Sequence, residues 1–142
     1  MSLTTFDQTW HDSIDGADVV QLEVPASPAY IAVVRTAAAG LAARVDLTLD
    51  RIEDLRIAVD EACALLVCRP SVDSPPEYLR CVFSVDVASL TVDISGPLTT
   101  LPATSAFAWA VLLALVDGVE SGDANGGTWL RLVVRREIGQ WT

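Results

Sequence analysis

The sequence predicts a two-layer α/β sandwich, in which helices cover one face of a mixed, mostly antiparallel sheet. Segments with strand alternation and segments with helical period follow one another along the chain, and two of the strand segments are adjacent. The chain has 142 residues, and 51% of them are apolar, which is sufficient for one core. We therefore expect residues 1–17 to form a flexible N-terminal segment and residues 18–142 to form a single domain.

The first half of the chain predicts one strand followed by two helices. Residues 19–26 alternate weakly and end near a proline, which indicates a strand. A helix is expected over residues 27–45, with Ser27 as its cap and a proline in its first turn. The strongest helical pattern covers residues 48–69, where Thr48 or Asp50 can provide the cap.

The second half predicts two strands, a helix and a closing strand. Apolar and polar residues alternate over 78–87, and a second strand segment covers 89–96. Residues 106–119 are apolar enough for a helix, and residues 121–127 are typical of a turn-rich loop. The closing strand is expected over 128–137, and a short strand before it remains an alternative.

The charge balance favours a protein partner over a nucleic acid. Asp and Glu number 19 against 9 Lys and Arg, which gives a net charge of −10. An acidic surface repels phosphate backbones, so we expect no direct nucleic-acid binding. No apolar stretch is long enough to span a membrane, and the N-terminus has no signal-peptide pattern, so we expect a cytoplasmic protein.

The cysteines do not predict a metal site. Cys63, Cys68 and Cys81 lack zinc-finger spacing, and His11 is the one histidine of the chain. Their apolar neighbours indicate buried free thiols, as in a reducing compartment. We expect no metal ligands among them.

The helix predicted over 48–69 has two different faces. At about 100° per residue, one face is an ordinary core stripe of Ile52, Leu55, Val59, Ala62, Cys63 and Leu66. The opposite stripe begins with Asp50 and Asp54, which a solvated helix start would explain. It continues through Ile57, Glu61 and Leu65, so Glu61 requires either a solvent-filled cleft or a paired partner.

Several segments together resemble the anti-sigma factor serine kinases of bacterial partner-switching systems. These segments are "LEVPAS", "LRIAVDEAC", "WAVLLALVD" and "GGTWLRL". The kinases belong to the larger group of histidine-kinase-like ATPases, and the resemblance extends over residues 19–137. It implies the same fold and a nucleotide site beside the long helix.

The resemblance also indicates that this nucleotide site is degenerate. The family's helix motif is E-A-x-x-N, in which the glutamate is the presumed general base and the asparagine holds Mg²⁺. Glu61 matches the glutamate, whereas Leu65 occupies the asparagine position. A leucine offers no oxygen to a hard cation, and phosphoryl transfer without Mg²⁺ loses charge neutralisation.

The family's next motif, D-x-G-x-G, is only partly present. Ser95 and Gly96 stand near the expected positions, while Asp93 lies too early in its strand for a match. The final motif is kept as Gly126, Gly127 and Thr128. Its threonine would lie near the phosphates, although this turn can also simply start the closing strand.

The family's glycine-rich lid is replaced by a segment without glycine. Residues 103–115 contain Phe107 and Trp109, which we expect to fill the space of a triphosphate or to cover the core locally. Lid glycines let backbone N–H groups approach phosphates. Their loss predicts weak or no ATP binding and no required cofactor.

The function that remains is protein binding. Arg35 lies 26 residues before Glu61, the family's separation for an arginine that contacts the sigma factor and the antagonist. Ile31 and Val34 would share that surface, although Arg35 as a solvated helix residue is the simpler alternative. We expect a homodimeric anti-sigma-factor-like regulator that binds a sigma factor, an anti-sigma-factor antagonist or both, without catalysis.

Two other functions remain open. The chain could be an active ATP-dependent serine/threonine kinase with Mg²⁺ and with Glu61 as the base, phosphorylating the antagonist. It could instead be a dimeric module whose partner is unrelated to sigma factors.

Overall fold

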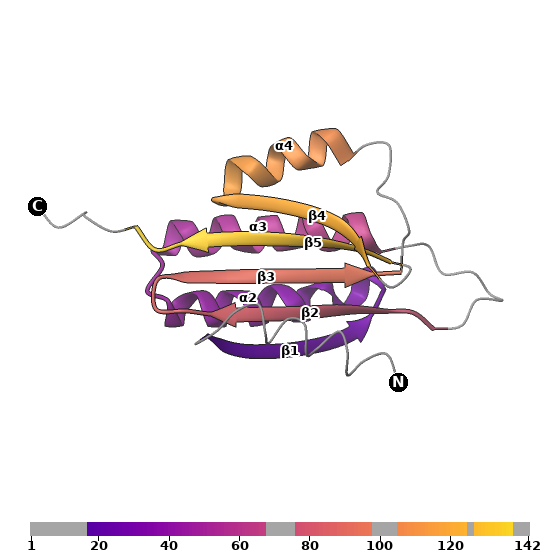
Figure 1. Ribbon diagram of the computed structural model, residues 1–142, viewed down its shortest axis with the longest axis horizontal. Helices are drawn as coiled ribbons and strands as arrows, with labels where there is room; N and C mark the ends of the chain where they lie inside the picture. The colour runs from indigo at the N-terminus through magenta and orange to yellow at the C-terminus, as the bar shows by residue number, and fades with distance from the viewer. Residues whose placement is uncertain (1–16, 68–75, 98–104, 125–126, 138–142) are drawn as a thin grey trace, which may run out of the picture.

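A computed structural model describes residues 17–67, 76–97, 105–124 and 127–137 of the chain. Five strands and three helices longer than one turn form two layers (Figure 1). In chain order the elements are β1 (Asp18–Pro25), η1 (Pro28–Tyr30), α2 (Ile31–Arg44), α3 (Leu49–Leu66), β2 (Tyr78–Val85), β3 (Ser89–Gly96), α4 (Ser105–Leu115), β4 (Gly118–Ala124) and β5 (Gly127–Arg135).

The sheet has the strand order β1-β2-β3-β5-β4. Each neighbouring pair in this sheet is antiparallel, so the predicted sandwich is confirmed while the expected mixed character is absent from the described strands. Helices α2 and α3 lie together on one face, and α4 packs against α3 near β4 (Figure 1). None of the helices in the described part of the chain is long and apolar enough to cross a membrane.

The helices begin at the capping residues that the sequence predicts. Ser27 Oγ accepts a hydrogen bond from the Ala29 N–H at 3.4 Å, and Thr48 Oγ1 accepts one from the Arg51 N–H at 3.3 Å. Thr48 rather than Asp50 therefore caps α3. The helix predicted from residue 27 onwards is divided into the short η1 turn and α2.

The core lies between the sheet and the α2–α3 layer. Alternate strand residues point toward the helices, and five of the six residues in the predicted core stripe of α3 are buried, with Ile52 partly buried beside them. Cys63 and Cys81 are buried free thiols, as predicted, while Cys68 lies outside the described residues. Burial raises the pKa of Cys81 to about 12 and also raises that of Cys63.

The segment after α4 differs from the expected helix end and loop, and it agrees with the alternative of a short strand before the closing one. The helix ends at Leu115, before the expected residue 119, and residues 118–124 form β4 at the edge of the sheet. Gly122 is paired with Trp129 of β5, and a Cβ on Gly122 would lie 2.6 Å from Trp129 Cζ2. Gly122, which suggested a loop in the sequence, is therefore needed in β4, because the Trp129 indole leaves no room for a side chain at this position.

Candidate nucleotide and partner site

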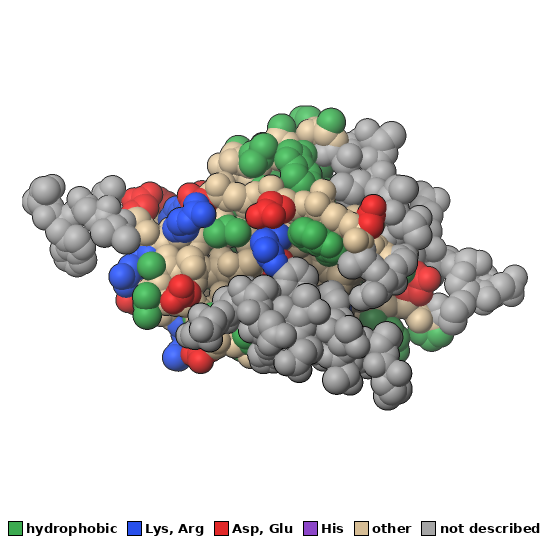
Figure 2. Space-filling model, in the orientation of Figure 1, with side chains coloured by type: hydrophobic (Ala, Val, Ile, Leu, Met, Phe, Trp, Pro, Cys, Tyr) green, Lys and Arg blue, Asp and Glu red, His purple; other side chains and the backbone are tan. Residues whose placement is uncertain are grey.

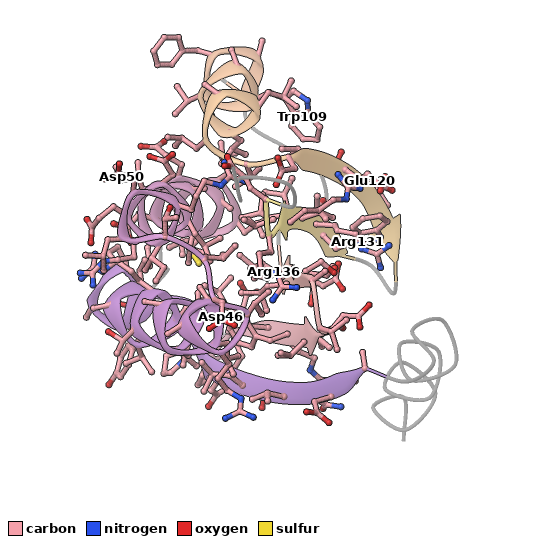
Figure 3. All side chains as sticks on the ribbon, turned by 90° about the vertical axis from the view of Figure 1, so that its left-hand side faces the viewer. Asp46, Asp50, Trp109, Glu120, Arg131 and Arg136 are labelled. Atoms are coloured by element: carbon pink, nitrogen blue, oxygen red, sulfur yellow. The ribbon has the colours of Figure 1, made fainter. Side chains whose placement is uncertain are left out.

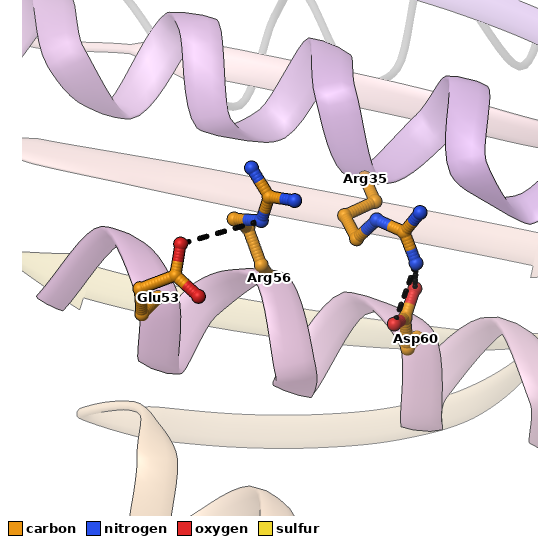
Figure 4. A network of polar contacts seen from close by, with 4 residues as sticks. All are labelled: Arg35, Glu53, Arg56 and Asp60. Carbon is orange, nitrogen blue, oxygen red and sulfur yellow. Dashed lines mark hydrogen bonds and ion pairs between the residues drawn. The ribbon is translucent and has the colours of Figure 1, made fainter. Parts of the chain in front are cut away.

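Helices α2 and α3 are joined by an ion pair close to the predicted catalytic position. Arg35 Nη1 donates hydrogen bonds to both carboxylate oxygens of Asp60, at 3.1 and 2.9 Å (Figure 4). Asp60 directly precedes Glu61, which is partly buried on α3. The adjacent residues Asp60 and Glu61 therefore lie in different environments. Asp60 holds the Arg35 guanidinium, whereas the Glu61 side chain points about 100° away around the helix.

The Arg35–Asp60 pair is only partly shielded from solvent. The two side chains are 32% and 39% exposed, so their contribution to stability is about 1 kcal/mol or less. Arg35 Nε is buried without a hydrogen-bond partner, whereas its Nη1 reaches the carboxylate. A second pair on α3, between Arg56 and Glu53 at 3.6 Å, lies nearby (Figure 4). The α2–α3 surface therefore presents ordered charges of both signs.

The predicted apolar part of the partner surface requires a correction. Val34 has no exposed surface, so its assignment as a partner-binding side chain is wrong. Ile31 is partly buried against the core and retains limited accessible surface. The large apolar side chains that are exposed at this end of the helix layer are Tyr30 and Val33, at 44% and 46%. Sequence reasoning missed Val33, because adjacent valines are separated by about 100° on a helix and only the contacts decide which one is buried.

The side chain at the magnesium position lies in the core. Leu65 is 7% exposed and belongs to the same buried cluster as Ala108 and Leu112 of α4. Glu61, one turn earlier, is only partly buried. Within the described residues, no three His, Cys, Asp or Glu side chains come together in a way that could hold a metal ion. The residue in place of the family's asparagine is thus a packing residue.

The C-terminal end of α3 lies directly on the end of β3. A Cβ on Gly96 would lie 2.9 Å from the Leu66 carbonyl oxygen, and 3.1 Å from both Leu66 Cβ and Leu79 Cδ2. Real Cβ atoms essentially never come within 3.0 Å of another atom, so the contact with the backbone carbonyl is the one that excludes a side chain here. Gly96, predicted as a nucleotide-binding remnant, therefore allows the close contact between the helix and the strand.

The remaining motif residues make internal hydrogen bonds at the same end of the sheet. Thr128 pairs with Gly96 across the β3–β5 ladder, is 3% exposed, and donates from Oγ1 to Asp123 Oδ1 at 3.3 Å. Ser95 Oγ donates to the Arg80 carbonyl oxygen at 3.4 Å. Gly127 begins β5, while Gly126 lies outside the described residues. The fold thus brings Leu65, Gly96 and Thr128 to one end, where each has a structural role.

Asp93 is on the face of the sheet opposite to α3. It follows Val92 and precedes Ile94, both of which face the core, and its Oδ1 accepts a hydrogen bond from Arg131 Nε at 2.7 Å. Burial raises the pKa of Asp93, and the Arg131 guanidinium opposes this rise. Figure 3 shows Arg131 and Glu120 on the side of the sheet away from α2 and α3. Asp93 is therefore excluded as an adenine ligand beside α3.

The aromatic residues that replace the lid behave differently from each other. Phe107 is 79% exposed, so the expectation that it fills the triphosphate space is wrong. Trp109 packs against the buried core, which agrees with the alternative of local hydrophobic cover (Figure 3). Residues 98–104, where much of a lid would lie, are outside the described residues.

Comparisons with known proteins give a consistent result. A family model for the histidine kinase-like ATPase domain matches residues 24–134. The serine-protein kinase RsbW of Bacillus subtilis (strain 168) is 47% identical over 49 residues, which cover 34% of this chain and 31% of that protein. The anti-sigma-F factor RsbW of Mycobacterium tuberculosis (strain ATCC 25618 / H37Rv) is 34% identical over 108 residues, which cover 75% and 62% of the two chains.

A solved structure is similar in fold. The crystal structure of the RsbU and RsbW domains of a Mycobacterium tuberculosis protein matches with a TM-score of 0.62 at 16% identity, covering 86% of this chain and 35% of that one. Identity at this level supports the fold alone. The chain spans about a third of the length of the Bacillus relative and 62% of the mycobacterial one.

Proposed function

This chain belongs to the histidine kinase-like ATPase domain family, among its anti-sigma factor serine kinases, and we propose that it binds a sigma factor, an anti-sigma-factor antagonist or both. In this proposal the fold acts by sequestering a protein, with weak or no ATP binding. The relatives named as serine-protein kinase and as anti-sigma-F factor support a regulator of this kind.

The observation that carries the proposal is the buried position of Leu65. The residue that would hold Mg²⁺ lies in the core, and the end of α3 touches β3 at Gly96. Protein binding does not depend on either position. It depends on an ordered surface, and the α2–α3 layer offers one.

The proposed partner surface is centred on Arg35. Its guanidinium is oriented by Asp60, and the partly buried Ile31 lies one turn earlier on the same face of α2. Arginine is one of the residue types enriched among the side chains that contribute most to the binding energy of an interface. The net charge of −10 suits a basic partner surface. We further propose a homodimer, as the resemblance implies.

Binding to a sigma factor tests the proposal. Arg35→Ala should weaken capture of a purified partner sigma factor by roughly tenfold or more, as expected for an interface arginine. Arg56→Ala is the matched control, because Arg56 is a similarly accessible arginine on the neighbouring helix. Binding by Arg35→Ala as tight as that of the unsubstituted chain would remove Arg35 from the interface.

A nucleotide titration tests the alternative of an active kinase, which the accessibility of Glu61 favours. Under the main proposal, millimolar ATP or ADP with Mg²⁺ leaves the melting temperature unchanged, since a ligand stabilises a protein only when it binds the native state. Phosphate transfer to a serine of the antagonist that is abolished by Glu61→Ala would establish the kinase instead.

A further inference from the structure

Helix α4 has one side in the core and an outer side that is exposed and apolar. Ala108 and Leu112 are 8% and 0% exposed, whereas Phe107 and Leu113 are 79% and 52% exposed. Residues 105–115 include no charged residue, and Figure 2 shows hydrophobic side chains gathered over this helix. A helix side that faces solvent is normally polar, so this one is suited to a further contact. Its exposed residues, which we call the α4 face, are Ala106, Phe107, Ala110, Leu113 and Ala114.

Helix α3 runs antiparallel to α4 and lies beside it. Arg51 Nη2, near the start of α3, donates a hydrogen bond to Asp117 Oδ2, just after the end of α4, at 2.6 Å. Leu65, near the end of α3, belongs to the same buried cluster as Ala108 near the start of α4. The side of α3 that carries Leu65 therefore faces α4.

This side of α3 has an exposed apolar residue between two carboxylates. At about 100° per residue, Asp54 and Glu61 lie within about 40° of Leu65 around the helix, and Ile57 lies about 80° from it. Ile57 is 47% exposed, and the two acids are partly buried. In the part of the chain that the structure describes, neither Asp54 nor Glu61 takes part in an ion pair. Apolar area and uncompensated negative charge thus lie next to each other.

Part of the α4 face is turned toward these carboxylates. Figure 3 shows Trp109 on the side of α4 that faces β4. Phe107 is two residues earlier and lies about 160° from Trp109 around the helix, so it points to the other side, where α3 lies. Ala114 is about 20° from Phe107 on the same side. The exposed apolar residues of the two helices therefore form one surface with acidic side chains beside it.

The charges discriminate between three possible occupants of this surface. If a second copy of the chain docked through α4, the carboxylates of both copies would come together, and like charges that face each other are unfavourable. An anionic lipid surface would also repel them, and helices that lie on such a surface carry Lys and Arg, which α4 lacks. An amphipathic helix with basic residues beside its apolar stripe matches both the apolar area and the charge.

We propose that the α4 face binds an amphipathic helix of a protein partner, whose apolar stripe packs on Phe107 and whose Lys or Arg residues pair with Asp54 and Glu61. This surface is separate from the one centred on Arg35. Asp60, which holds the Arg35 guanidinium, lies about 120° from Asp54 around α3. Binding at one surface therefore does not require binding at the other.

Binding of a synthetic amphipathic peptide to the full chain tests the proposal. The probe is a fluorescent helix of Leu and Lys with about 18 residues, or five turns, and the matched peptide has Glu in place of every Lys. Fluorescence anisotropy should show saturable binding of the Leu/Lys peptide and roughly tenfold or more weaker binding of the Leu/Glu peptide. Equal binding of the two peptides, or no binding of the Leu/Lys peptide, would overturn the proposal.

Substitutions on α4 test whether the peptide binds at the α4 face. Phe107→Ser with Leu113→Ser should weaken binding of the Leu/Lys peptide roughly tenfold or more, because the large apolar contacts are lost. Val87→Ser is the matched control, since Val87 is 81% exposed on the β2–β3 connection, and it should bind as the unsubstituted chain does. Unchanged affinity in the doubly substituted α4 variant would show that the peptide binds elsewhere and would refute the proposal.

The acidic residues of α3 are tested in the same way. Asp54→Asn with Glu61→Gln should weaken binding by about threefold or more at low salt, and the effect should shrink at high salt because exposed ion pairs are screened. The control, Asp18→Asn with Glu23→Gln, removes the same charge from β1, which lies at the other edge of the sheet from β4. An equal loss of affinity in both variants would show attraction to the whole acidic chain and would contradict a specific site.

A fluorescent reporter on α4 gives a measurement that keeps the large apolar side chains in place. In a Cys68→Ser background, Cys63 and Cys81 are buried, so a polarity-sensitive dye can be attached to Ala110→Cys. Its emission should shift when the Leu/Lys peptide is added, whereas the same dye on Val87→Cys should not respond. A shift that follows protein concentration alone would assign the α4 face to a second copy, and a shift with phosphatidylserine vesicles but not with the peptide would assign it to a membrane. Either result would overturn the proposal.

Discussion

Gly96 provides the sharpest test of whether the former nucleotide motif now has a structural role. In Gly96→Ala the new Cβ would lie 2.9 Å from the Leu66 carbonyl oxygen and 3.1 Å from Leu79 Cδ2. The first contact is with backbone, so the end of α3 must shift. Forcing one extra carbon into a packed region costs about 1–3 kcal/mol. With an unfolding entropy of about 2.1 cal/mol/K per residue, a loss of about 2 kcal/mol lowers the melting temperature by roughly 7 °C.

Gly40→Ala is the matched control for this experiment. Gly40 lies within α2, and no atom lies within 4 Å of its built Cβ. Alanine in a helix interior is favoured over glycine by about 0.5–1 kcal/mol, so this variant should melt at a higher temperature. The melting temperatures of both variants are measured by thermal unfolding followed by circular dichroism. An unchanged melting temperature in Gly96→Ala would refute the close contact between α3 and β3.

Three further predictions follow from the ionisable groups and thiols. Because burial raises the pKa of Asp93, its contribution to stability is present below its ordinary pKa and is lost as pH rises through the folded-state value. The melting-temperature difference between the unsubstituted chain and Asp93→Asn should therefore shift in favour of the unsubstituted chain as pH falls, and a flat difference would contradict the raised pKa. Cys81 should react with thiol reagents at mildly alkaline pH no faster than the chain unfolds, because the thiol is buried and its pKa is about 12. Asp60→Ala should lower the melting temperature by only about 3 °C or less, because its pair with Arg35 is partly exposed, and a much larger drop would show a strongly desolvated pair.

The elements with strong local signals could be predicted from the sequence. Helix α3 has a capping threonine, a clear apolar stripe and a proline after its end, so both its existence and its core face were correct. Strand β2 follows from the alternation of its residues, and β3 is the second strand expected directly after it. In these segments the local pattern and the tertiary contacts favour the same structure.

The errors occur where a distant contact decides the outcome. Strand β4 has two glycines and a serine, so its propensity is poor, and it forms because it pairs with β5. Val34 and Val33 have identical side chains, and the packing of α2 determines that Val34 is buried. Gly96 is also ambiguous in the sequence, because a glycine can serve a ligand or a neighbouring backbone equally well.

Leu65 shows how loss of a metal ligand can stabilise the fold. A buried leucine side chain contributes about 1.5–3 kcal/mol, whereas an asparagine at the same position would bury an amide that must find partners, at a cost of about 1–3 kcal/mol. Leu65→Asn, which restores the family's residue, should therefore destabilise the protein by about 3 kcal/mol or more. Leu49→Asn is the control, because Leu49 on the same helix is 81% exposed and should tolerate the change. A stable Leu65→Asn variant that binds ATP with Mg²⁺ would show that the asparagine position still faces an open site, and the proposal of a binding domain without ATP chemistry would then fail.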